Sequence, residues 1–148
     1  MIVCVTENNI MEAAEIHAIT WRAAHQGFCS EELIAQYTTA NQKKYLESKM
    51  MEGEKHYMLV EQYPVGIVSV HGDLIENLYI LPTEQHKGYG RKLLLFAIEH
   101  CEGCPRLLVL ENNKKAQALY QKFGFKFTGK KEPFPGQVCE LEMKKEQN

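Results

Sequence analysis

The stretch Gln85-His86-Lys87-Gly88-Tyr89-Gly90-Arg91 decides the fold, because it joins two apolar segments of different character. Residues 74–81 before it have the composition of a strand, and the continuous apolar run 93–98 after it predicts a largely buried helix. Two glycines in a turn that opens a helix leave backbone N–H groups unpaired and directed outward. With the helix dipole and the side chains of Lys87 and Arg91 beside them, these groups predict a phosphate site. A turn that needs its glycines only for its own backbone is the alternative.

Length and composition indicate an ordinary soluble globule. The chain has 148 residues, of which 45% are hydrophobic and 24% charged, enough for one domain with a sizeable core. Its net charge of -2 and the lack of a basic stripe interleaved with aromatic residues argue against a nucleic-acid partner. No apolar run approaches the roughly 20 residues that cross a bilayer, and the first residues lack the layout of a signal peptide. We therefore expect no membrane partner and a cytoplasmic location.

The five cysteines give no sign of a metal or redox site. Only Cys101 and Cys104 have a suggestive spacing, and no second pair of cysteines or histidines occurs at ligand spacing. The pair also lies at the C-terminal end of a predicted helix, where the dipole disfavours a thiolate. We expect reduced structural cysteines and no metal.

The pattern of apolar residues predicts the order strand, helices, three strands, helix, strand, helix, two strands. The first strand is expected within residues 1–7, and the helices after it are expected to be capped by Asn8 or Asn9, by Ser30 and by Asn41. The remaining elements are strands at 56–61, 65–70, 74–81, 105–110, 125–128 and 137–143, a helix capped by Asn113, a loop at 132–136 and a frayed polar tail at 144–148.

A dinucleotide-binding unit is one interpretation of the phosphate loop. A strand, a Gly-x-Gly turn, a helix and a second strand follow one another, and Glu111 at the end of that strand is near where a ribose-binding acid belongs. Three features oppose it. Leu93 occupies the third glycine position, the loop after Ile80 is longer than a tight turn, and the unit follows an antiparallel meander.

The downstream half favours another interpretation. Residues 113–125, Asn-Lys-Lys-Ala-Gln-Ala-Leu-Tyr-Gln-Lys-Phe-Gly-Phe, resemble the closing signature of the GNAT superfamily of acetyl-CoA-dependent N-acetyltransferases. The positions that fit are Asn113, Ala116, Tyr120, Gly124 and Phe125. The pattern Gln85-x-x-Gly88-x-Gly90 resembles the family's pyrophosphate loop, and Leu78-Tyr79-Ile80-Leu81-Pro82 resembles the strand before it. Two motifs at this separation make the resemblance specific, and the element order is similar to that fold over essentially the whole chain.

The resemblance implies a mixed α/β (α+β) fold, in which one domain over residues 1–148 has a central, mostly antiparallel sheet of six to seven strands with helices on both faces. It also implies that acetyl-CoA is the acetyl donor, and that its pyrophosphate lies on the amides of Gln85, His86, Lys87, Gly88, Tyr89, Gly90 and Arg91. The pantetheine arm would pair with an exposed strand edge where the next strand splays away, at Leu78, Tyr79 and Ile80. The coenzyme site would be completed by Asn113, Ala116 and Tyr120.

The resemblance also implies how an acetyl group reaches a primary amine by direct attack. Tyr120 is expected to give a proton to the departing thiolate, since a phenol with a pKa of about 10 is protonated at neutral pH. A backbone amide of strand 74–81 would stabilise the tetrahedral oxyanion. Glu76 on this strand is the candidate base for the amine, ahead of Glu111. A tyrosine that only packs, an Asn113 that only caps its helix and a surface Glu76 paired with a lysine are the alternatives.

A different part of the chain is expected to select the acceptor, namely the region of Trp21, Arg22, His25 and Phe28 together with the loop at 133–136. A small-molecule amine and a peptide amine are both left open, and so is a homodimer. A protein that binds acyl-CoA as a sensor, without turnover, is the non-enzymatic alternative. The intact motifs oppose it.

Overall fold

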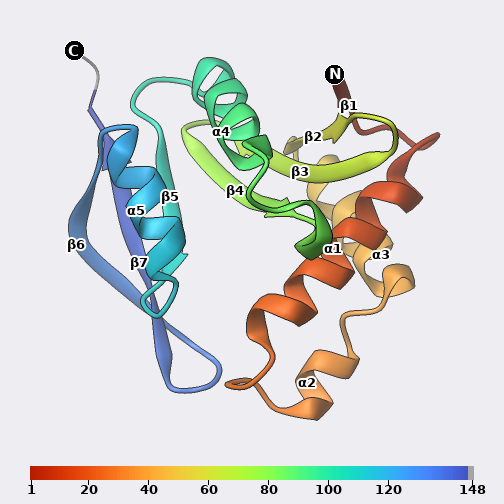
Figure 1. Ribbon diagram of the computed structural model, residues 1–148, viewed down its shortest axis with the longest axis horizontal. Helices are drawn as coiled ribbons and strands as arrows, with labels where there is room; N and C mark the ends of the chain where they lie inside the picture. The colour runs from red at the N-terminus through yellow and green to blue at the C-terminus, as the bar shows by residue number, and fades with distance from the viewer. Residues whose placement is uncertain (147–148) are drawn as a thin grey trace.

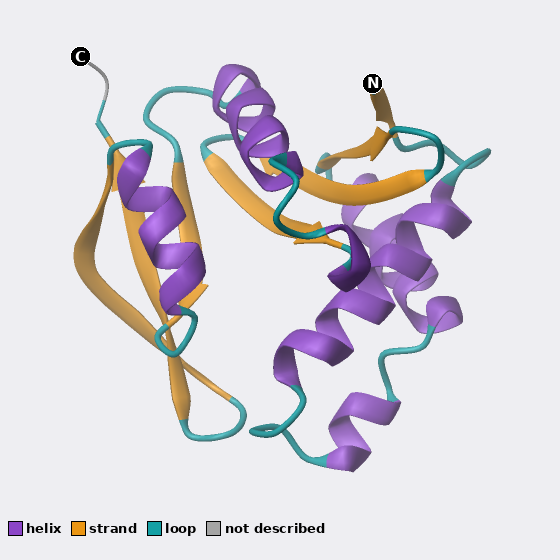
Figure 2. Ribbon diagram, viewed as in Figure 1, coloured by secondary structure: helices purple, strands orange, loops and turns teal. Residues whose placement is uncertain are grey.

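The computed structural model describes residues 1–146 of the chain. Its elements follow the predicted order (Figures 1 and 2). They are β1 (Ile2–Cys4), α1 (Ile10–His25), α2 (Glu31–Ala35), α3 (Thr39–Met51), β2 (Lys55–Val60), β3 (Pro64–His71), β4 (Leu74–Ile80), the short 3-10 helix η1 (Pro82–Glu84), α4 (Tyr89–His100), β5 (Arg106–Leu110), α5 (Lys114–Lys122), β6 (Phe125–Phe134) and β7 (Val138–Lys145).

Seven strands form one sheet in the order β1-β2-β3-β4-β5-β7-β6. Neighbouring strands are antiparallel except β4 and β5, which are parallel. The predicted meander is present as β2, β3 and β4. The mixed, mostly antiparallel sheet expected from the sequence is therefore confirmed.

Helices cover both faces of this sheet, as expected. In Figure 2, α4 and α5 lie in front of the strands, where Leu93, Leu94 and Tyr120 join one buried cluster. On the opposite face, α1 and α3 form a second cluster, in which Leu46 packs with Ile67 of β3. Because strand side chains alternate between faces, a single sheet can supply both clusters.

β4 and β5 are adjacent only at their first residues. Their pairing is restricted to Leu74 with Arg106 and Ile75 with Leu107, and beyond these residues the two strands diverge (Figure 1). Asn77 of β4 has a φ of 54°, and the pairing of β4 with β3 shifts register in this region. A bulge of this kind bends a strand and increases its twist. The sheet is consequently opened near its middle, as the resemblance implied.

Side-chain caps confirm some predicted helix starts and correct others. Ser30 and Asn113 cap α2 and α5 as predicted. Helix α3 begins after Thr38, whose Oγ1 accepts a hydrogen bond from the N–H of Asn41, so Asn41 lies within the first turn and is not the cap. Asn9 precedes α1, but its side chain makes no capping bond and instead holds the loop before the helix.

The last hairpin is longer than predicted. β6 continues through Phe134, so the loop expected at 132–136 is reduced to a turn at 135–137. Three residues of this extension, Lys130, Lys131 and Glu132, are charged, and pairing with β7 makes the extension a strand that composition alone does not indicate. Gly129, with a φ of 91°, lies where the β6–β7 register shifts and lets the strand bend there.

The predicted tail is partly a strand. Lys144 and Lys145 belong to β7, because they pair across the sheet with residues of β5 and β6. Residues 147–148 of that predicted tail lie outside the described residues.

Candidate active site

A cleft of about 620 Å³ occupies the opening between β4 and β5. Its walls come from α1, the segment from α2 into α3, the two diverging strands, α5 and the C-terminal hairpin. Predicted residues from distant parts of the chain line it: Trp21, His25, Glu76, Leu78, Tyr79, Asn113 and Tyr120. The fold therefore brings the expected catalytic pair, Tyr120 of α5 and Glu76 of β4, to one cavity.

Other predicted residues lie beside this cleft. Arg22 Nη1 donates to the carbonyl of Tyr37 (2.5 Å), which ties α1 to the segment before α3. Phe28 packs against the turn of the last hairpin, where a Cβ on Gly136 would lie 2.3 Å from the Phe28 carbonyl oxygen. The glycine loop, Ile80 and Ala116 are also outside the lining. Arg22 and Phe28, which the sequence predicts for the acceptor region, thus lie outside the lining of the cleft.

Tyr120 is buried, with 8% of its surface exposed, yet it lines the cleft. Its hydroxyl has no hydrogen-bond partner within residues 1–146. Burial raises the pKa of Tyr120 to about 12, above the ordinary phenol value assumed from the sequence. The side chain therefore stays protonated at neutral pH, with an unpaired hydroxyl available as a donor.

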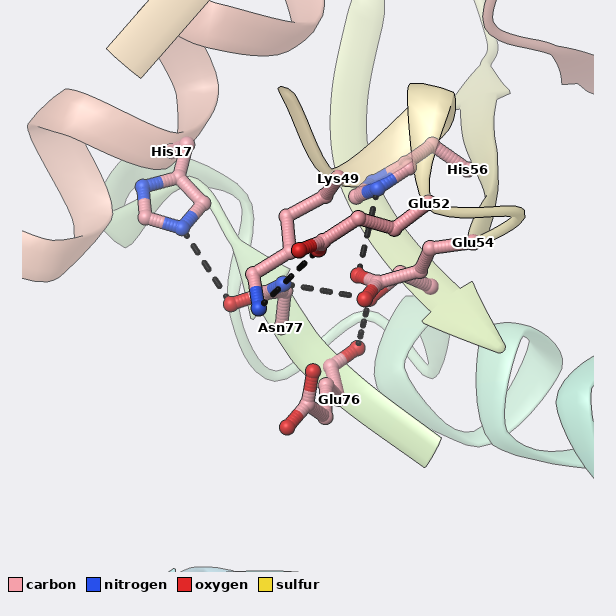
Figure 3. Close-up of polar contacts among 8 residues, drawn as sticks. His17, Lys49, Glu52, Glu54, His56, Glu76 and Asn77 are labelled. Carbon is pink, nitrogen blue, oxygen red and sulfur yellow. Dashed lines mark hydrogen bonds and ion pairs between the residues drawn. The ribbon is translucent and has the colours of Figure 1, made fainter. Parts of the chain in front are cut away.

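Glu76 lies on β4 between the residues paired to β5 and the bulge. Burial raises the pKa of Glu76, and the charge of Glu54 raises it further. Its carboxylate points away from the buried Glu54–His56 pair (Figure 3). No ion pair holds it within the described part of the chain, so the predicted alternative of a lysine partner is not what the structure has. A carboxylate of this kind is a stronger base than an exposed glutamate.

A chain of hydrogen bonds fixes the bulge of β4 (Figure 3). Gln42 Nε2 lies 3.0 Å from His17 Nδ1, and His17 Nε2 lies 3.2 Å from Asn77 Oδ1. Asn77 Nδ2 then donates to Ser69 Oγ (3.1 Å), whose hydroxyl donates to the carbonyl of Glu76 (3.0 Å). Helices α1 and α3 and strand β3 are thereby connected to the residue at which β4 bends.

His17 serves this chain as a neutral ring. Burial lowers the pKa of His17 to about 4. The hydrogen-bond network assigns the proton to Nε2, which donates to Asn77, and leaves Nδ1 to accept from Gln42. Tyr45 and Tyr79 pack against the ring at centroid distances of 5.5 and 5.2 Å. The ring is therefore held on several sides.

These polar residues were missed in the sequence, although a signal was present. His17 follows Ile10, Ala13 and Ala14 at helical spacing, so it interrupts an otherwise apolar face of α1. Asn77 likewise lies in the middle of a strand rich in apolar residues. A polar side chain at such a position requires a buried partner. The sequence could have indicated that partners exist, but not that these two are partners of each other.

The glycine loop begins α4 without a side-chain cap. Gly88 is the N-cap residue and has a φ of 84°, a conformation that favours glycine. Gly90 is different, because a Cβ there would meet only Ile80 and Leu119 at 3.8 and 3.9 Å, which are ordinary contacts. Nothing inside the described protein requires glycine at position 90. Close approach by a ligand would explain it.

The charges beside this loop differ from the expectation. Lys87 Nζ lies 3.1 Å from a carboxylate oxygen of the buried Glu84, which also accepts a hydrogen bond from Tyr63 (2.8 Å). Lys87 is therefore engaged within the protein. Arg91 lies over the ring of Phe123 at 5.4 Å. The Lys115 ammonium approaches His86 Nε2 at 3.0 Å and adds a cation that the sequence did not indicate.

Gln85 and Asn113 are the first residues of the two motifs, and each makes a hydrogen bond to the backbone. Gln85 Nε2 donates to the carbonyl of Ile80 at the end of β4 (3.2 Å), which links the loop to that strand. Asn113 Oδ1 accepts from the N–H of Ala116 (3.1 Å), so its role as a helix cap is confirmed, and Asn113 also lines the cleft.

Aromatic rings form the wall of the cleft beside the predicted acceptor region. Trp21 stacks on His25 at 3.8 Å and on Tyr37 at 3.4 Å between ring centroids. His25 in turn lies 5.3 Å from the ring of Phe134 on β6. Burial lowers the pKa of His25, which keeps its ring neutral. Trp21 is both buried in this stack and part of the cleft surface.

Cysteine chemistry and metal binding gain no support from the structure. All five cysteines are free, and burial together with Asp73 raises the pKa of Cys101 to about 11. Within residues 1–146, no group of three or more His, Cys, Asp or Glu side chains could hold a metal ion. No helix in that range is long and apolar enough to cross a membrane.

Comparison with known families places the two motifs in one domain. A family model described as an acetyltransferase (GNAT) domain matches residues 52–127, about half of the chain. The matched segment includes the bulged strand, the glycine loop and Tyr120.

Two curated proteins are similar to this chain in sequence over part of its length, and a solved structure is similar to it in fold over nearly all of it. A peptidyl-lysine N-acetyltransferase of Salmonella typhimurium is 35% identical over 69 residues, which cover 47% of each chain. A spermine/spermidine N(1)-acetyltransferase of Bacillus subtilis is 40% identical over 60 residues, 37% of this chain and 40% of the relative. The chain thus spans less than half the length of these curated relatives. The PaiA N-acetyltransferase of Thermoplasma acidophilum, determined in complex with coenzyme A, has the same fold, with a TM-score of 0.73 and 21% identity over 99% of this chain and 98% of that one.

Proposed function

The chain belongs to the GNAT acetyltransferase family, and on that premise we propose that it transfers an acetyl group from acetyl-CoA to a primary amine. One observation carries the proposal above all. The cleft opened by the divergence of β4 and β5 is lined both by an unpaired, protonated tyrosine, Tyr120, and by an unpaired carboxylate, Glu76. These are the acid and the base that acetyl transfer to an ammonium requires.

The coenzyme would enter along β4 with its pyrophosphate on the glycine loop. The uncapped first turn of α4 offers N–H groups at the positive end of the helix dipole. The protein itself does not require glycine at position 90, and the pantetheine arm would lie along Leu78, Tyr79 and Ile80. Arg91 and Lys115 are the cations nearest this loop. We assign Lys87 a smaller part, because Glu84 already neutralises it.

Glu76, Tyr120 and water together account for the proton transfers of the reaction. Glu76 accepts a proton from the incoming ammonium, and the resulting amine nitrogen attacks the acetyl carbonyl carbon. The nitrogen of the tetrahedral adduct releases its second proton to water, the adduct collapses by breaking the carbon–sulfur bond, and Tyr120 donates its hydroxyl proton to the departing thiolate. Water returns a proton to Tyr120 and takes one from Glu76 after the products leave.

The bulge of β4 would supply the oxyanion donor. Asn77 and Leu78 have no register partner in β3 or in β5 among the described residues. Both residues line the cleft, and we infer that a backbone N–H of the bulge faces it. A fixed backbone N–H aimed at a developing oxyanion contributes strongly to acyl transfer. The hydrogen bonds from His17 to Asn77 and onward to Ser69 would hold that donor in place.

The curated relatives point to an aliphatic amine. One acts on peptidyl-lysine and the other on spermine or spermidine, and both acceptors present a primary amine on a methylene chain. The direct test is to incubate the protein with acetyl-CoA and a panel of polyamines, amino acids and lysine peptides, with products identified by mass. Acetylation of at least one amine supports the proposal. Tight acetyl-CoA binding with no product from any amine would favour a sensor instead.

A further inference from the structure

The charged side chains that line the cleft are all acidic. Glu76 and Glu140 supply them, and no lysine or arginine of the described chain contributes to the lining. The two histidines in it, His17 and His25, have pKa values lowered by burial and stay neutral. The cleft therefore carries negative charge that no cation in its lining balances.

Glu140 concentrates this charge on the wall opposite β4. It lies on β7, directly across from Glu132 of β6 and from Leu110 of β5. Like charges directly opposite each other on antiparallel strands are destabilising. Burial raises the pKa of Glu140, and the charges of Glu132 and then Glu76 raise it further. No ion pair relieves Glu140 or Glu132 within residues 1–146.

His25 adds an unused hydrogen-bond acceptor to this end of the cleft. The residue is 3% exposed, and its Nδ1 lies 2.7 Å from the carbonyl of Trp21, to which it donates. The neutral ring then carries a lone pair on Nε2, which has no partner among the described residues. Trp21 and Phe134 flank the ring at 3.8 and 5.3 Å. Aromatic faces, an imidazole lone pair and a carboxylate all bind an ammonium group.

We propose that the acceptor is a linear aliphatic diamine or polyamine, whose second ammonium group binds between Glu140, His25 and the ring of Phe134 while its first amine reacts beside Glu76. The inference rests on the proposed function and names its substrate class. A second cation relieves the repulsion around Glu140. An acceptor with a carboxylate in place of the second ammonium group would be repelled by Glu140. An acceptor with an uncharged tail would leave Glu140 without a partner.

A series of three amines of equal length tests the proposal. Pentylamine, 1,5-diaminopentane and 5-aminopentanoate share a five-carbon chain and differ in the group at the far end, which is uncharged, cationic or anionic. We expect kcat/KM for the diamine to exceed that for pentylamine by about tenfold or more, the range of a charge-assisted hydrogen bond, and 5-aminopentanoate to be the poorest. In Glu140→Gln the preference for the diamine over pentylamine should fall to within about threefold, through KM.

A matched substitution on the same strand provides the control. Glu142 pairs with Arg106 and accepts from Thr128, so Glu142→Gln removes a carboxylate of β7 that does not line the cleft. This variant should keep the preference for the diamine. Glu140→Gln should melt at the same temperature as the parent or higher at neutral pH, because it removes a like-charge repulsion. A lowered melting temperature would mean that Glu140 serves the fold.

The outcomes separate the two proposals. Equal kcat/KM for all three amines, or a diamine preference that survives Glu140→Gln, would overturn the diamine assignment and leave the acetyltransferase intact. Acetylation of a lysine peptide in preference to every diamine would do the same. Binding of acetyl-CoA in a calorimeter with no acetylation of any amine would overturn the proposed function, and the diamine assignment with it.

Discussion

His17 of α1 donates a hydrogen bond of 3.2 Å to Asn77, the residue of β4 with a φ of 54°. Sixty positions separate the two residues in the chain. A non-glycine residue in this conformation is uncommon, and asparagine tolerates it better than most. The bond therefore connects a helix of one layer to the backbone position at which the sheet opens.

Substitution of Asn77 should separate backbone conformation from side-chain support. Asn77→Gly can retain the positive φ but loses the hydrogen bonds to His17 and Ser69. Asn77→Ala loses the same hydrogen bonds and also disfavours the positive φ. We expect Asn77→Ala to be less stable than Asn77→Gly by about 1 kcal/mol, the cost of a left-handed conformation for a residue with a Cβ. Both should lower kcat more than acetyl-CoA affinity. Thermal melting, steady-state kinetics and calorimetry provide the readouts, and unchanged kcat in both variants would remove the bulge from the mechanism.

Gly90 should govern coenzyme affinity without governing the fold. Gly90→Ala adds a methyl group that the protein accommodates in ordinary contacts, and it replaces a glycine in a helix, so stability should rise by roughly 0.5–1 kcal/mol. The same methyl group obstructs the approach of a pyrophosphate, and acetyl-CoA affinity should fall by about tenfold. Calorimetry on the folded variant measures this. Gly88→Ala is the control that should lose stability, because of its φ of 84°. Unaltered affinity in Gly90→Ala would mean that the loop is only a turn.

Glu76 should set the acidic limb of the pH–rate profile. Its pKa is raised by burial and by Glu54, so kcat/KM should increase with pH through a midpoint above that of an exposed glutamate. Glu76→Gln should lower the rate and abolish that limb. A profile that keeps the same midpoint in Glu76→Gln would show that another group is the base.

The raised pKa of Glu76 also has a consequence for stability. A carboxyl whose pKa is higher in the folded than in the unfolded protein favours the fold while it is protonated, and this contribution is lost as pH rises through the folded pKa. Glu76→Gln should therefore melt above the parent protein at pH 7. The difference should vanish below the unfolded value of about 4.3. Equal melting temperatures at pH 7 would indicate that folding does not raise the pKa of Glu76.

Coenzyme preference tests the family assignment against the dinucleotide interpretation. Acetyl-CoA should stabilise the protein by about 2.7 kcal/mol at a hundredfold excess over its dissociation constant, whereas NAD should do much less. A thermal-shift comparison is sufficient. A larger shift with NAD would restore the dinucleotide interpretation.

Local motifs explain how much of the site could be predicted from the sequence. Gly88 begins a helix and Asn113 caps one, and both roles depend on neighbours a few residues away. Tyr120 was placed by a motif of the same local kind. Features that depend on distant partners were not predictable. Lys115 reaches His86 only because the fold brings the start of α5 beside the glycine loop.

The same distinction holds for the fold. The meander and the helix order follow from periodicity and turn signals, and both are confirmed. The extension of β6 to Phe134 depends on a ladder with β7, which forms only in tertiary context. The connection of His17 to Asn77 required the three-dimensional arrangement of α1 and β4, which no single segment specifies.

The central claim is that Tyr120 donates the proton to the departing thiolate, and Tyr120→Phe tests it most directly. The substitution keeps the buried ring, and the hydroxyl it removes has no partner in residues 1–146, so melting temperature and acetyl-CoA affinity should change little. Single-turnover acetyl transfer to the best amine should slow by about 10²-fold, the lower end for a positioned general acid, since a thiolate leaves readily. Normal turnover with normal coenzyme binding would contradict the claim.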